Sequence, residues 1–392
     1  MRKQLKNYIN VPRIRAKYRL AAHKKRSKIL DELVDLTHMP RKSLIRTLNK
    51  NPRKPKKRQG PNSTYKPEKI VPVLKTIWFA MDQPCSRKLK AALPHWLPFY
   101  ELMYDCVDND TKEKIVSIST PTIDRILKPI KAKTERKRFC GTKPGTILKN
   151  QIPIKVNQWS ETDPGFVETD TVAHCGMSMD GDFIWSLTMT DILTGWTENR
   201  ATWNKGAEGV CKQIKDVEDN LPFEIKGFDC DNGSEFLNWH VIKYFKNRPE
   251  SRMVQFTRSR PYKKNDNAHV EQKNWTHVRE LFGYDRFENP RLVDLMNDLY
   301  KNEWSLYQNH FMPNMKCIEK IKVNSKYKKK YDEPKTPYER VLACDKIPKE
   351  AKEKLKAIHE KLNPFELKEG IEKKLNQIFK WVHVSRPIRK RK

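Results

Sequence analysis

Apolar positions in the first fifty residues recur at the spacing of short amphipathic helices. The stretch from Ser27 to Leu36 places four of them on one helical face: Ile29, Leu30, Leu33 and Leu36. The residues before Pro40 should break this helix, because a residue preceding proline resists the helical region. A second helix is expected from Arg41 to Asn49. Two short helices around a tight turn predict a helix-turn-helix unit over residues 1–50.

The second of these helices is rich in basic residues, which favours DNA binding. The residues expected on its exposed face are Arg41, Lys42, Ser43 and Arg46. The alternative is a plain helical hairpin with a solvated basic face. A basic Pro/Gly linker should follow at 51–65, either tracking phosphates or acting as a spacer.

Helical spacing returns over residues 66–132, which we interpret as a second DNA-binding module. One helix is expected from Val71 to Met81 and another from Ser86 to Leu93. A third should begin near Ser119 and run to about Lys131, with Pro129 kinking it or ending it early. Residues 133–158 are again basic and are expected to form a linker.

Between residues 159 and 312 the spacing of apolar residues changes, and alternation typical of strands appears beside helical spacing. Strands are expected at Gly165–Val172, Phe183–Thr190 and Trp196–Trp203, with an Asp-Gly turn between the first two. A helix, a strand, a helix, a strand and a helix should follow, at 206–219, 224–230, 234–246, 252–258 and 267–283. This order predicts an α/β fold, a mixed five-stranded sheet with helices on both faces. A further helix is expected at 290–307, and residues 313–392 form a basic C-terminal region, extended at first and helical over 349–379.

The charge balance points to a polyanionic partner. The chain has 80 Lys and Arg against 48 Asp and Glu, a formal net charge of +32. Such a surface binds nucleic acid, although lysine-rich codon usage can contribute to the excess. No run of about 18 apolar residues and no apolar leader segment is present, so we expect neither a membrane partner nor export. The eight cysteines form no CxxC pair, as expected for free thiols in a reducing cytoplasm. A DNA-binding protein in the cytoplasm is expected to associate with the nucleoid.

Acidic residues recur at the ends of the expected strands. Glu168 and Asp170 lie two apart on one strand and therefore share a face, and Asp229 and Asp231 repeat this arrangement. From the residues alone, either acid of each pair can be a ligand. Together with Glu271, such carboxylates can converge and hold two Mg²⁺ ions about 3.5–4 Å apart, and Mn²⁺ can substitute. The alternatives are edge-strand acids, a turn or N-cap Asp231, and a first-turn Glu271 favoured by the helix dipole.

Glu271 opens the expected helix at 267–283 on the same stripe as Trp275, Val278 and Phe282. We therefore expect its carboxylate to point inward with the stripe. Arg279 lies two turns on and is expected to touch a phosphate. The basic loop before this helix should meet DNA near the cut, or else be a solvated mobile loop. Its candidate residues are Arg258, Arg260, Lys263, Lys264 and Asn265.

Residues 160–310 resemble the catalytic core of the retroviral-integrase-like DDE transposases. The matching segments are Glu168-Thr169-Asp170, Met189-Thr190-Asp191, Asp231-Asn232-Gly233-Ser234-Glu235-Phe236, and Arg260-Pro261-Tyr262 leading to Val270-Glu271. The resemblance implies an RNase H-like fold with Asp170, Asp231 and Glu271 as the catalytic, metal-binding triad. With two helical units in front, the whole chain is similar to insertion-sequence transposases. It has no His-His-Cys-Cys zinc module, so zinc binding is not implied.

The resemblance also implies a reaction and partners. The enzyme would nick DNA at terminal inverted repeats and join the exposed 3′-OH to target DNA, and pairing two ends requires at least a homodimer. A DNA-binding regulator with an inactive core and a ribonuclease acting on RNA–DNA hybrids are the alternatives. Two other polar sites are expected to be structural, Asp191 in a turn and His174-Cys175 in packing.

Overall fold

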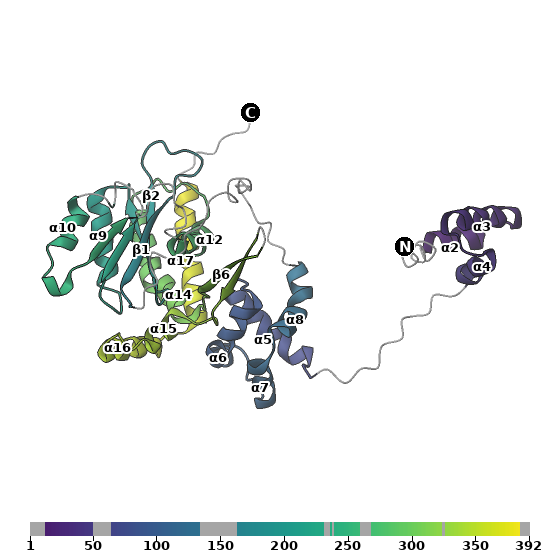
Figure 1. The fold of residues 1–392 in the computed structure, drawn as a ribbon, viewed down its shortest axis with the longest axis horizontal. Helices are drawn as coiled ribbons and strands as arrows, with labels where there is room; N and C mark the ends of the chain where they lie inside the picture. The colour runs from purple at the N-terminus through teal and green to yellow at the C-terminus, as the bar shows by residue number, and fades with distance from the viewer. Residues whose placement is uncertain are drawn as a thin grey trace. The chain divides into compact units, whose positions relative to one another are not determined.

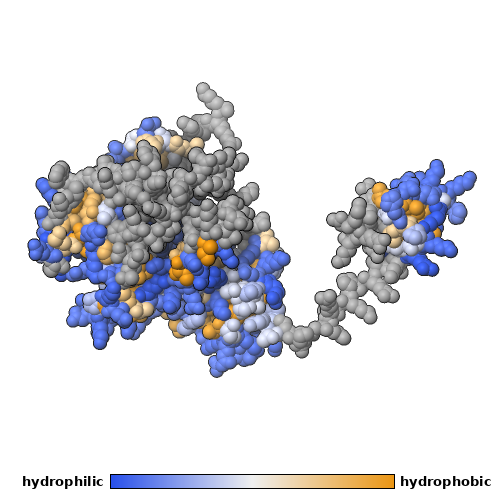
Figure 2. Space-filling model, in the orientation of Figure 1, coloured by the Kyte–Doolittle hydropathy of each residue, from blue (hydrophilic) through white to orange (hydrophobic). Residues whose placement is uncertain are grey.

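The computed structural model describes residues 12–49, 64–133, 163–230, 236, 239–258, 268–323 and 326–384. The chain divides into two compact units, Met1–Thr64 and Tyr65–Lys392 (Figure 1). None of the helices within the described ranges is long and apolar enough to cross a bilayer. The described residues that are coloured in Figure 2 are mostly hydrophilic, with small separate apolar patches, as the high charge of the chain leads one to expect.

The N-terminal unit is a small three-helix bundle made of α2 (Pro12–Leu20), α3 (His23–Thr37) and α4 (Arg41–Asn49). The break between α3 and α4 lies where the sequence predicts it, and His38 turns the chain with a φ of 53°. The core consists of Tyr18, Ile29, Leu30, Leu33, Leu44 and Leu48.

One core prediction for this unit is wrong. Leu36 is 53% exposed, whereas Thr37 is 5% exposed and donates from its hydroxyl to the carbonyl of Leu33. Thr37 lies four residues after Leu33 and therefore continues the buried stripe at the end of the helix, where Leu36 has turned toward solvent.

The next four helices are α5 (Pro67–Ala80), α6 (Ser86–Met103), α7 (Asn109–Ser117) and α8 (Thr120–Lys133). Helix α6 runs ten residues beyond its predicted end and contains Pro94 and Pro98. Helix α8 likewise continues through Pro129 to Lys133, so Pro129 does not end it early and the predicted end near Lys131 is confirmed to within two residues. Helix α7 was not foreseen. Its N-cap is Asp108, whose carboxylate accepts from the backbone N–H of Thr111 at 3.0 Å.

These four helices pack mainly against one another, and their core continues into the rest of the larger unit. Their buried side chains belong to one cluster that also contains residues of the later helices at 292–311 and 364–384. Trp96 Nε1 donates to the carbonyl of Phe311 at 3.2 Å, and Tyr307 donates from its hydroxyl to the carbonyl of Ala80 at 2.6 Å. The stretch that looks like a separate module in sequence therefore packs as one side of the larger unit.

The sheet of the larger unit is the predicted mixed five-stranded α/β sheet. Its strands are β1 (Phe166–Ala173), β2 (Ile184–Asp191), β3 (Thr197–Trp203), β4 (Gly227–Cys230) and β5 (Gln255–Arg258). Their order is β3-β2-β1-β4-β5. β1 pairs antiparallel with β2, as β2 does with β3, whereas β1–β4 and β4–β5 pair parallel. Gly181, with a φ of 72°, lies in the predicted turn between β1 and β2.

Helices cover both faces of this sheet (Figure 1). One face packs Val167, Leu187 and Phe228 against α9 (Ala207–Glu218) and α10 (Trp239–Lys246). A short 3₁₀ turn, η2 (Glu250–Arg252), then leads to β5.

The other face carries two long composite helices. The first consists of α11 (Ala268–Lys273), the π-helical segment η3 (Asn274–Arg279) and α12 (Glu280–Phe282). The second consists of α13 (Leu292–Leu299), the π-helical η4 (Tyr300–Trp304) and α14 (Ser305–Phe311).

The C-terminal region is more structured than its composition suggests. A two-stranded ribbon, β6 (Cys317–Val323) and β7 (Lys326–Tyr331), precedes α15 (Pro337–Ala343), α16 (Lys349–His359) and α17 (Pro364–Val384). Thr336 and Glu339 form a capping box that starts α15. Phe365, Ile371 and Ile378 of α17 join the shared core, so this region is part of the larger unit.

Three buried histidines should make this unit acid-sensitive. His174, His277 and His310 are each at most 4% exposed. Burial lowers the pKa of His174 and of His310 to about 3, and it lowers the pKa of His277 well below its usual value. Because the unfolded chain takes up these protons near pH 6.5 and the folded chain does not, stability is lost as the pH falls below 6.5. Each buried histidine contributes about 1.4 kcal/mol per pH unit.

We expect a lower midpoint of urea unfolding at pH 5 than at pH 7. Asp191 opposes the trend, because burial raises the pKa of its carboxyl group, but three histidines outweigh one acid. A His174→Phe variant should show a flatter pH dependence whatever its stability at neutral pH. Equal midpoints at pH 5 and pH 7 for the wild-type protein would contradict this prediction.

Candidate active site

Strand β1 presents two carboxylates to the face covered by α11. Glu168 and Asp170 alternate with Val167, which joins the core on the opposite face. Glu168 is 2% exposed, whereas Asp170 is half-buried. The sequence predicts that the two acids share a face, and the contacts of both with the composite helix 268–282 agree with this.

Two hydrogen bonds tie the first turns of this helix to β1. The backbone N–H of Val270 donates to Glu168 Oε2 at 3.0 Å, and Asn274 Nδ2 donates to Asp170 Oδ2 at 2.7 Å. The other oxygen of Asp170 accepts from the backbone N–H of Thr171 at 2.7 Å. Glu271 lies in the same turn, between Val270 and Asn274, and is exposed. The fold therefore brings the strand of Asp170 and the helical turn of Glu271 into direct contact.

The third candidate, Asp231, lies outside the described residues. The residue before it, Cys230, is the parallel partner of Thr169, which is the residue before Asp170. One step earlier, Asp229 pairs with Glu168, is 3% exposed and accepts from the hydroxyl of Thr257 at 2.7 Å. The strand register thus aligns the residue before Asp170 with the residue before Asp231.

Burial differs among the candidate acids that the structure describes. Glu168 and Asp229 are buried and hydrogen-bonded within the fold, whereas Asp170 is partly accessible and Glu271 is exposed. Among the residues that the structure describes, no three His, Cys, Asp or Glu side chains form a ready metal-binding group. Asp231 is not among those residues, so this finding covers only part of the predicted triad.

The expected inward direction of Glu271 is wrong. Glu271 is exposed and Trp275 is 47% exposed, whereas Val278 and Phe282 are buried. The cause is the π-helical segment from Asn274 to Arg279, whose i→i+5 turns are wider than α-helical turns. Positions before this segment are therefore out of phase with the buried stripe after it.

Sequence reasoning missed Asn274. It lies three residues after Glu271, so the two side chains are neighbours on the helix, and its amide contacts Asp170. The available signal was its spacing from a suspected catalytic glutamate. The role of Glu168, which holds the start of α11 through the Val270 N–H, was also not foreseen.

Positive charge collects beside the same helix. Burial lowers the pKa of Lys273 to about 7, and the positive charges of Lys88 on α6 and Arg340 on α15 lower it further. Lys273 directly follows Gln272 and the candidate Glu271. The positive charges of Lys88 and Arg340 therefore lie close enough to Lys273 to act on its ammonium group.

The structure describes only two of the DNA-binding residues predicted for the core, Arg279 and Arg258. Arg279 lies 4.7 Å from the ring centroid of Tyr284 and donates to the carbonyl of Gly283 at 3.3 Å. Burial lowers the pKa of its guanidinium. It is thus engaged within the fold, which argues against the phosphate contact expected for it. Arg258 ends β5. The loop residues Arg260, Lys263, Lys264 and Asn265 lie outside the described residues.

The predicted DNA-binding face of the N-terminal unit is accessible. Lys42 and Arg46 on α4 are exposed, and Ser43 is half-buried. Arg41 is exposed as well, but it pairs with Asp31 and donates to Ser27 Oγ at 2.6 Å. Arg41 therefore has a structural role in fixing α4 against α3, and Lys42 and Arg46 are the better candidates for phosphate contacts.

Asp191 and His174 are built into the fold, in agreement with the structural interpretation of both. Asp191 is 1% exposed and accepts from the backbone N–H groups of Gly165 at 2.8 Å and Thr194 at 2.7 Å. His174 stacks on Phe287 with a centroid distance of 4.9 Å, and its Nε2 lies 2.8 Å from Ser186 Oγ.

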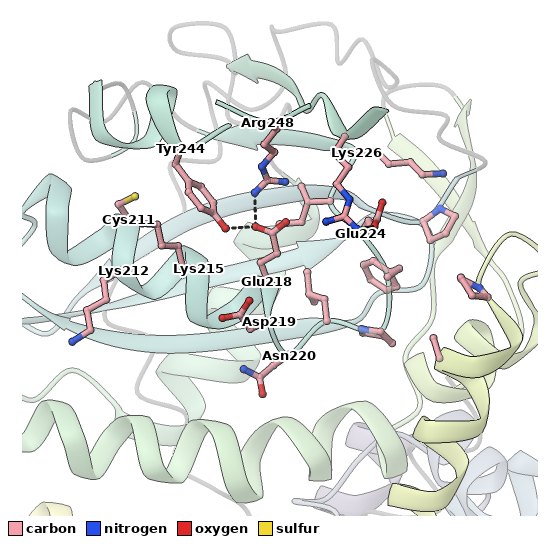
Figure 3. A pocket seen from close by; sticks show the side chains of 18 of the residues that line it. Cys211, Lys212, Lys215, Glu218, Asp219, Asn220, Glu224, Lys226, Tyr244 and Arg248 are labelled. Carbon is pink, nitrogen blue, oxygen red and sulfur yellow. Dashed lines mark hydrogen bonds and ion pairs between the residues drawn. The ribbon is translucent and has the colours of Figure 1, made fainter. Parts of the chain in front are cut away.

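A large hollow of about 2050 Å³ lies elsewhere on this unit, between α9, α10 and α16 (Figure 3). Pro164 and Lys226, which come just before β1 and β4, line it, so it lies at the amino ends of these strands. Glu218 accepts from Tyr244 and, at 2.5 Å, from Arg248 (Figure 3). Ligands of open α/β sheets bind at the carboxyl ends, so this hollow is not the candidate active site.

No model of a known protein family matches the chain. Over 329 residues it is 33% identical to y4rM, an uncharacterized protein of Sinorhizobium fredii, and the alignment covers 83% of this chain and 91% of that protein. The chain belongs to the y4rM family. In this member of the y4rM family, the candidate active site is the contact of β1 with the first turns of the composite helix, where Asn274 donates to Asp170 and Glu271 lies one turn before Asn274.

Proposed function

We propose that this protein is a DDE-type transposase that cleaves DNA at the ends of an insertion sequence and joins them to a target. The observation that carries the proposal is the bond from Asn274 to Asp170, because it brings the turn of Glu271 onto the strand of Asp170. The parallel register of β1 with β4 supports the inclusion of Asp231, since it pairs the residues that precede the two aspartates.

The topology supports an RNase H-like core. We infer this fold from the strand order β3-β2-β1-β4-β5, in which the first three strands form an antiparallel meander and the last two join parallel. Helices on both faces agree with this inference. In such a sheet the central strand β1 carries Asp170, and its neighbour β4 ends at the residue before Asp231.

The residues present fit a pair of Mg²⁺ or Mn²⁺ ions. Carboxylate oxygens are the ligands that hard cations prefer, and Asp170, Asp231 and Glu271 would hold them. Asp170 is half-buried and Glu271 is exposed, so both carboxylates are reachable from solvent. When bound, the ions would neutralise the charge that develops on the attacking and leaving oxygens of a phosphodiester.

The chain's own residues would orient these ligands. The amide of Asn274 holds one oxygen of Asp170, which fixes the rotation of that carboxylate. Glu168 anchors the first turn of α11 and thereby sets the position of Glu271 relative to β1. Both interactions are made within the folded protein before any substrate arrives, and such pre-organisation lowers the cost of reaching the transition state.

Double-stranded DNA is the substrate that the charge supports. The N-terminal unit would bind the terminal inverted repeats through the exposed Lys42 and Arg46 of α4. The cleaved 3′-OH would then attack target DNA in the same site. Bringing two ends together requires at least a dimer of this chain, and the substrate places the protein at the nucleoid.

The test is a cleavage assay with the full-length protein. Labelled DNA from the two flanks of its own gene is incubated with Mg²⁺, with Mn²⁺ and with chelator. We expect metal-dependent nicking at the gene's ends and joining of the 3′-OH products. Binding of the flanks without cleavage in either metal would favour a DNA-binding regulator, and cleavage of only an RNA–DNA hybrid would favour a ribonuclease.

Glu168 should tolerate a substitution that a metal ligand does not. A Glu168→Gln variant keeps a side-chain oxygen that can accept from Val270 N–H, so we expect cleavage within about tenfold of wild type. Glu168→Ala leaves that N–H unsatisfied, which costs about 1–3 kcal/mol and should lower both cleavage and stability. The readout is the cleavage rate beside that of Asp170→Asn. Equal inactivity of Glu168→Gln and Asp170→Asn would make Glu168 a ligand instead of a positioning residue.

A further inference from the structure

The ribbon β6–β7 is a basic arm outside the five-stranded sheet (Figure 1). Its two strands contain six lysines and one glutamate. Lys328, Lys329 and Lys330 are all exposed, and so are the apolar side chains of Ile318 at 60% and Ile321 at 47%. An isolated two-stranded ribbon is only marginally stable in water. This one exposes side chains that either water or a partner must cover.

The base of the arm is held firmly. The backbone N–H of Lys316 donates to Asp332 Oδ1 at 2.6 Å, and Asp332 pairs with Arg340 of α15 at 2.8 Å. The ammonium group of Lys316 donates to the carbonyl of Leu193, in the turn between β2 and β3, at 2.6 Å. The ribbon therefore starts from a fixed point on the larger unit, so its position relative to the sheet is set near its base.

The positive charge of the arm is not balanced within it. Glu319 lies 4.0 Å from Lys330, its cross-strand partner. Within the described part of the chain, Lys328 and Lys329 have no acidic partner. The two strands contain six lysines and one glutamate, and the exposed Lys328, Lys329 and Lys330 follow one another, so like charges repel along the ribbon. A polyanion lying along the ribbon would remove this repulsion.

We propose that the β6–β7 ribbon is a duplex-DNA contact surface. A two-stranded antiparallel ribbon fits the major groove of B-form DNA, where its lysines would meet the phosphates on both sides. The exposed Ile318 and Ile321 would contact base edges or sugars, since apolar side chains are otherwise costly to leave in water. The inference rests on the proposed DNA substrate, and it adds a contact that neither the predicted helix-turn-helix nor the loop before α11 supplies.

The test is a salt titration of DNA binding by the full-length protein. The variant is Lys328→Gln with Lys329→Gln, and the matched control is Lys354→Gln with Lys356→Gln, which removes the same charge from exposed positions on α16. Anisotropy of a labelled duplex gives the dissociation constant from low to moderate salt. Two lost phosphate contacts should lower the slope of log K against log salt by about 2. We also expect binding to weaken by about tenfold at low salt, and the control should change little.

The substrates and controls separate the possible outcomes. A loss on both a gene-flank duplex and a random duplex supports a general DNA contact, and a loss on the flank alone supports a contact at the ends. No difference from the α16 control, or a preference for an RNA duplex, overturns the proposal, because the deep, narrow major groove of A-form RNA excludes such a ribbon. Unchanged unfolding midpoints show that the variants fold.

Failure of this proposal and failure of the transposase proposal can be told apart. If the wild-type protein never cleaves DNA but the ribbon variant binds DNA more weakly, the ribbon proposal stands and the transposase proposal is refuted. If the wild-type protein cleaves DNA and the ribbon variant binds like the α16 control, the transposase proposal stands and the ribbon proposal is refuted.

Discussion

A Glu271→Gln variant is expected to bind flank DNA like the wild-type protein and to cleave it at least about a thousandfold more slowly. A thousandfold loss corresponds to about 4 kcal/mol of transition-state stabilisation, which is in the range expected when a metal ligand is removed. Glu271 is exposed on a turn that is anchored to β1 at both sides, by Val270 and by Asn274. Its replacement should therefore leave the fold intact and remove only a ligand.

Asp170→Asn should have the same effect for the same reason. The amide oxygen of the new side chain can still accept from Asn274, so the local structure has little cause to change. A matched control is Asp294→Asn, which neutralises an exposed acid on α13. The measurement compares single-turnover cleavage rates with binding constants on the same duplex. Substantial strand joining by purified Glu271→Gln or Asp170→Asn would refute the assignment.

The second large effect is expected at Arg200, in the middle of β3. Its side chain is 1% exposed, and it donates to Glu198 at 3.0 Å and to Asp216 at 2.5 Å. Glu198 is 2% exposed and also accepts from Trp196 Nε1 and from Ser305 Oγ. An Arg200→Ala variant would leave the Glu198 carboxylate buried without its cation. Breaking a buried pair in this way costs about 3–5 kcal/mol of the free energy of unfolding.

Tryptophan fluorescence can measure this loss cleanly, because all ten tryptophans lie between Trp78 and Trp381, within the larger unit. The double variant Arg200→Met with Glu198→Gln removes both charges and should lose less stability than Arg200→Ala. An exposed pair serves as the control. Arg252 and Glu224 lie 3.1 Å apart with side chains that are both well exposed, so Arg252→Ala should change stability by less than about 1 kcal/mol. A loss of similar size in Arg200→Ala and Arg252→Ala would contradict the prediction.

The strands and most helices of the core follow from local pattern. Alternation of apolar and polar residues predicts β1, β2 and β3 to within one or two residues at their ends. The helix break before Pro40 and the start of α8 near Thr120 follow from proline chemistry, which acts within a few residues. Local rules could not give the length of α6, because Pro94 and Pro98 lie within a helix that packs against α14 and α17.

Some features of the candidate site likewise follow from local pattern, and others depend on tertiary packing. Local pattern is enough to show that Glu168 and Asp170 share one face of a strand, because side chains alternate along β structure. The sequence by itself also determined the charge that makes DNA the expected partner. Which acid of the pair is accessible was decided by tertiary structure, since the start of α11 buries Glu168 and leaves Asp170 half-buried.

Tertiary structure alone decided three further features. The π-helical segment turns Glu271 toward solvent, against the phase of its apolar stripe, because a wider turn cannot be read from a pattern with α-helical period. The amide of Asn274 gains its partner only when the helix packs on β1. Helices α5 to α8 read as a separate module in sequence, but their core continues into α14 and α17, which lie more than 200 positions after α6. Periodicity shows that a face is apolar without showing what covers it.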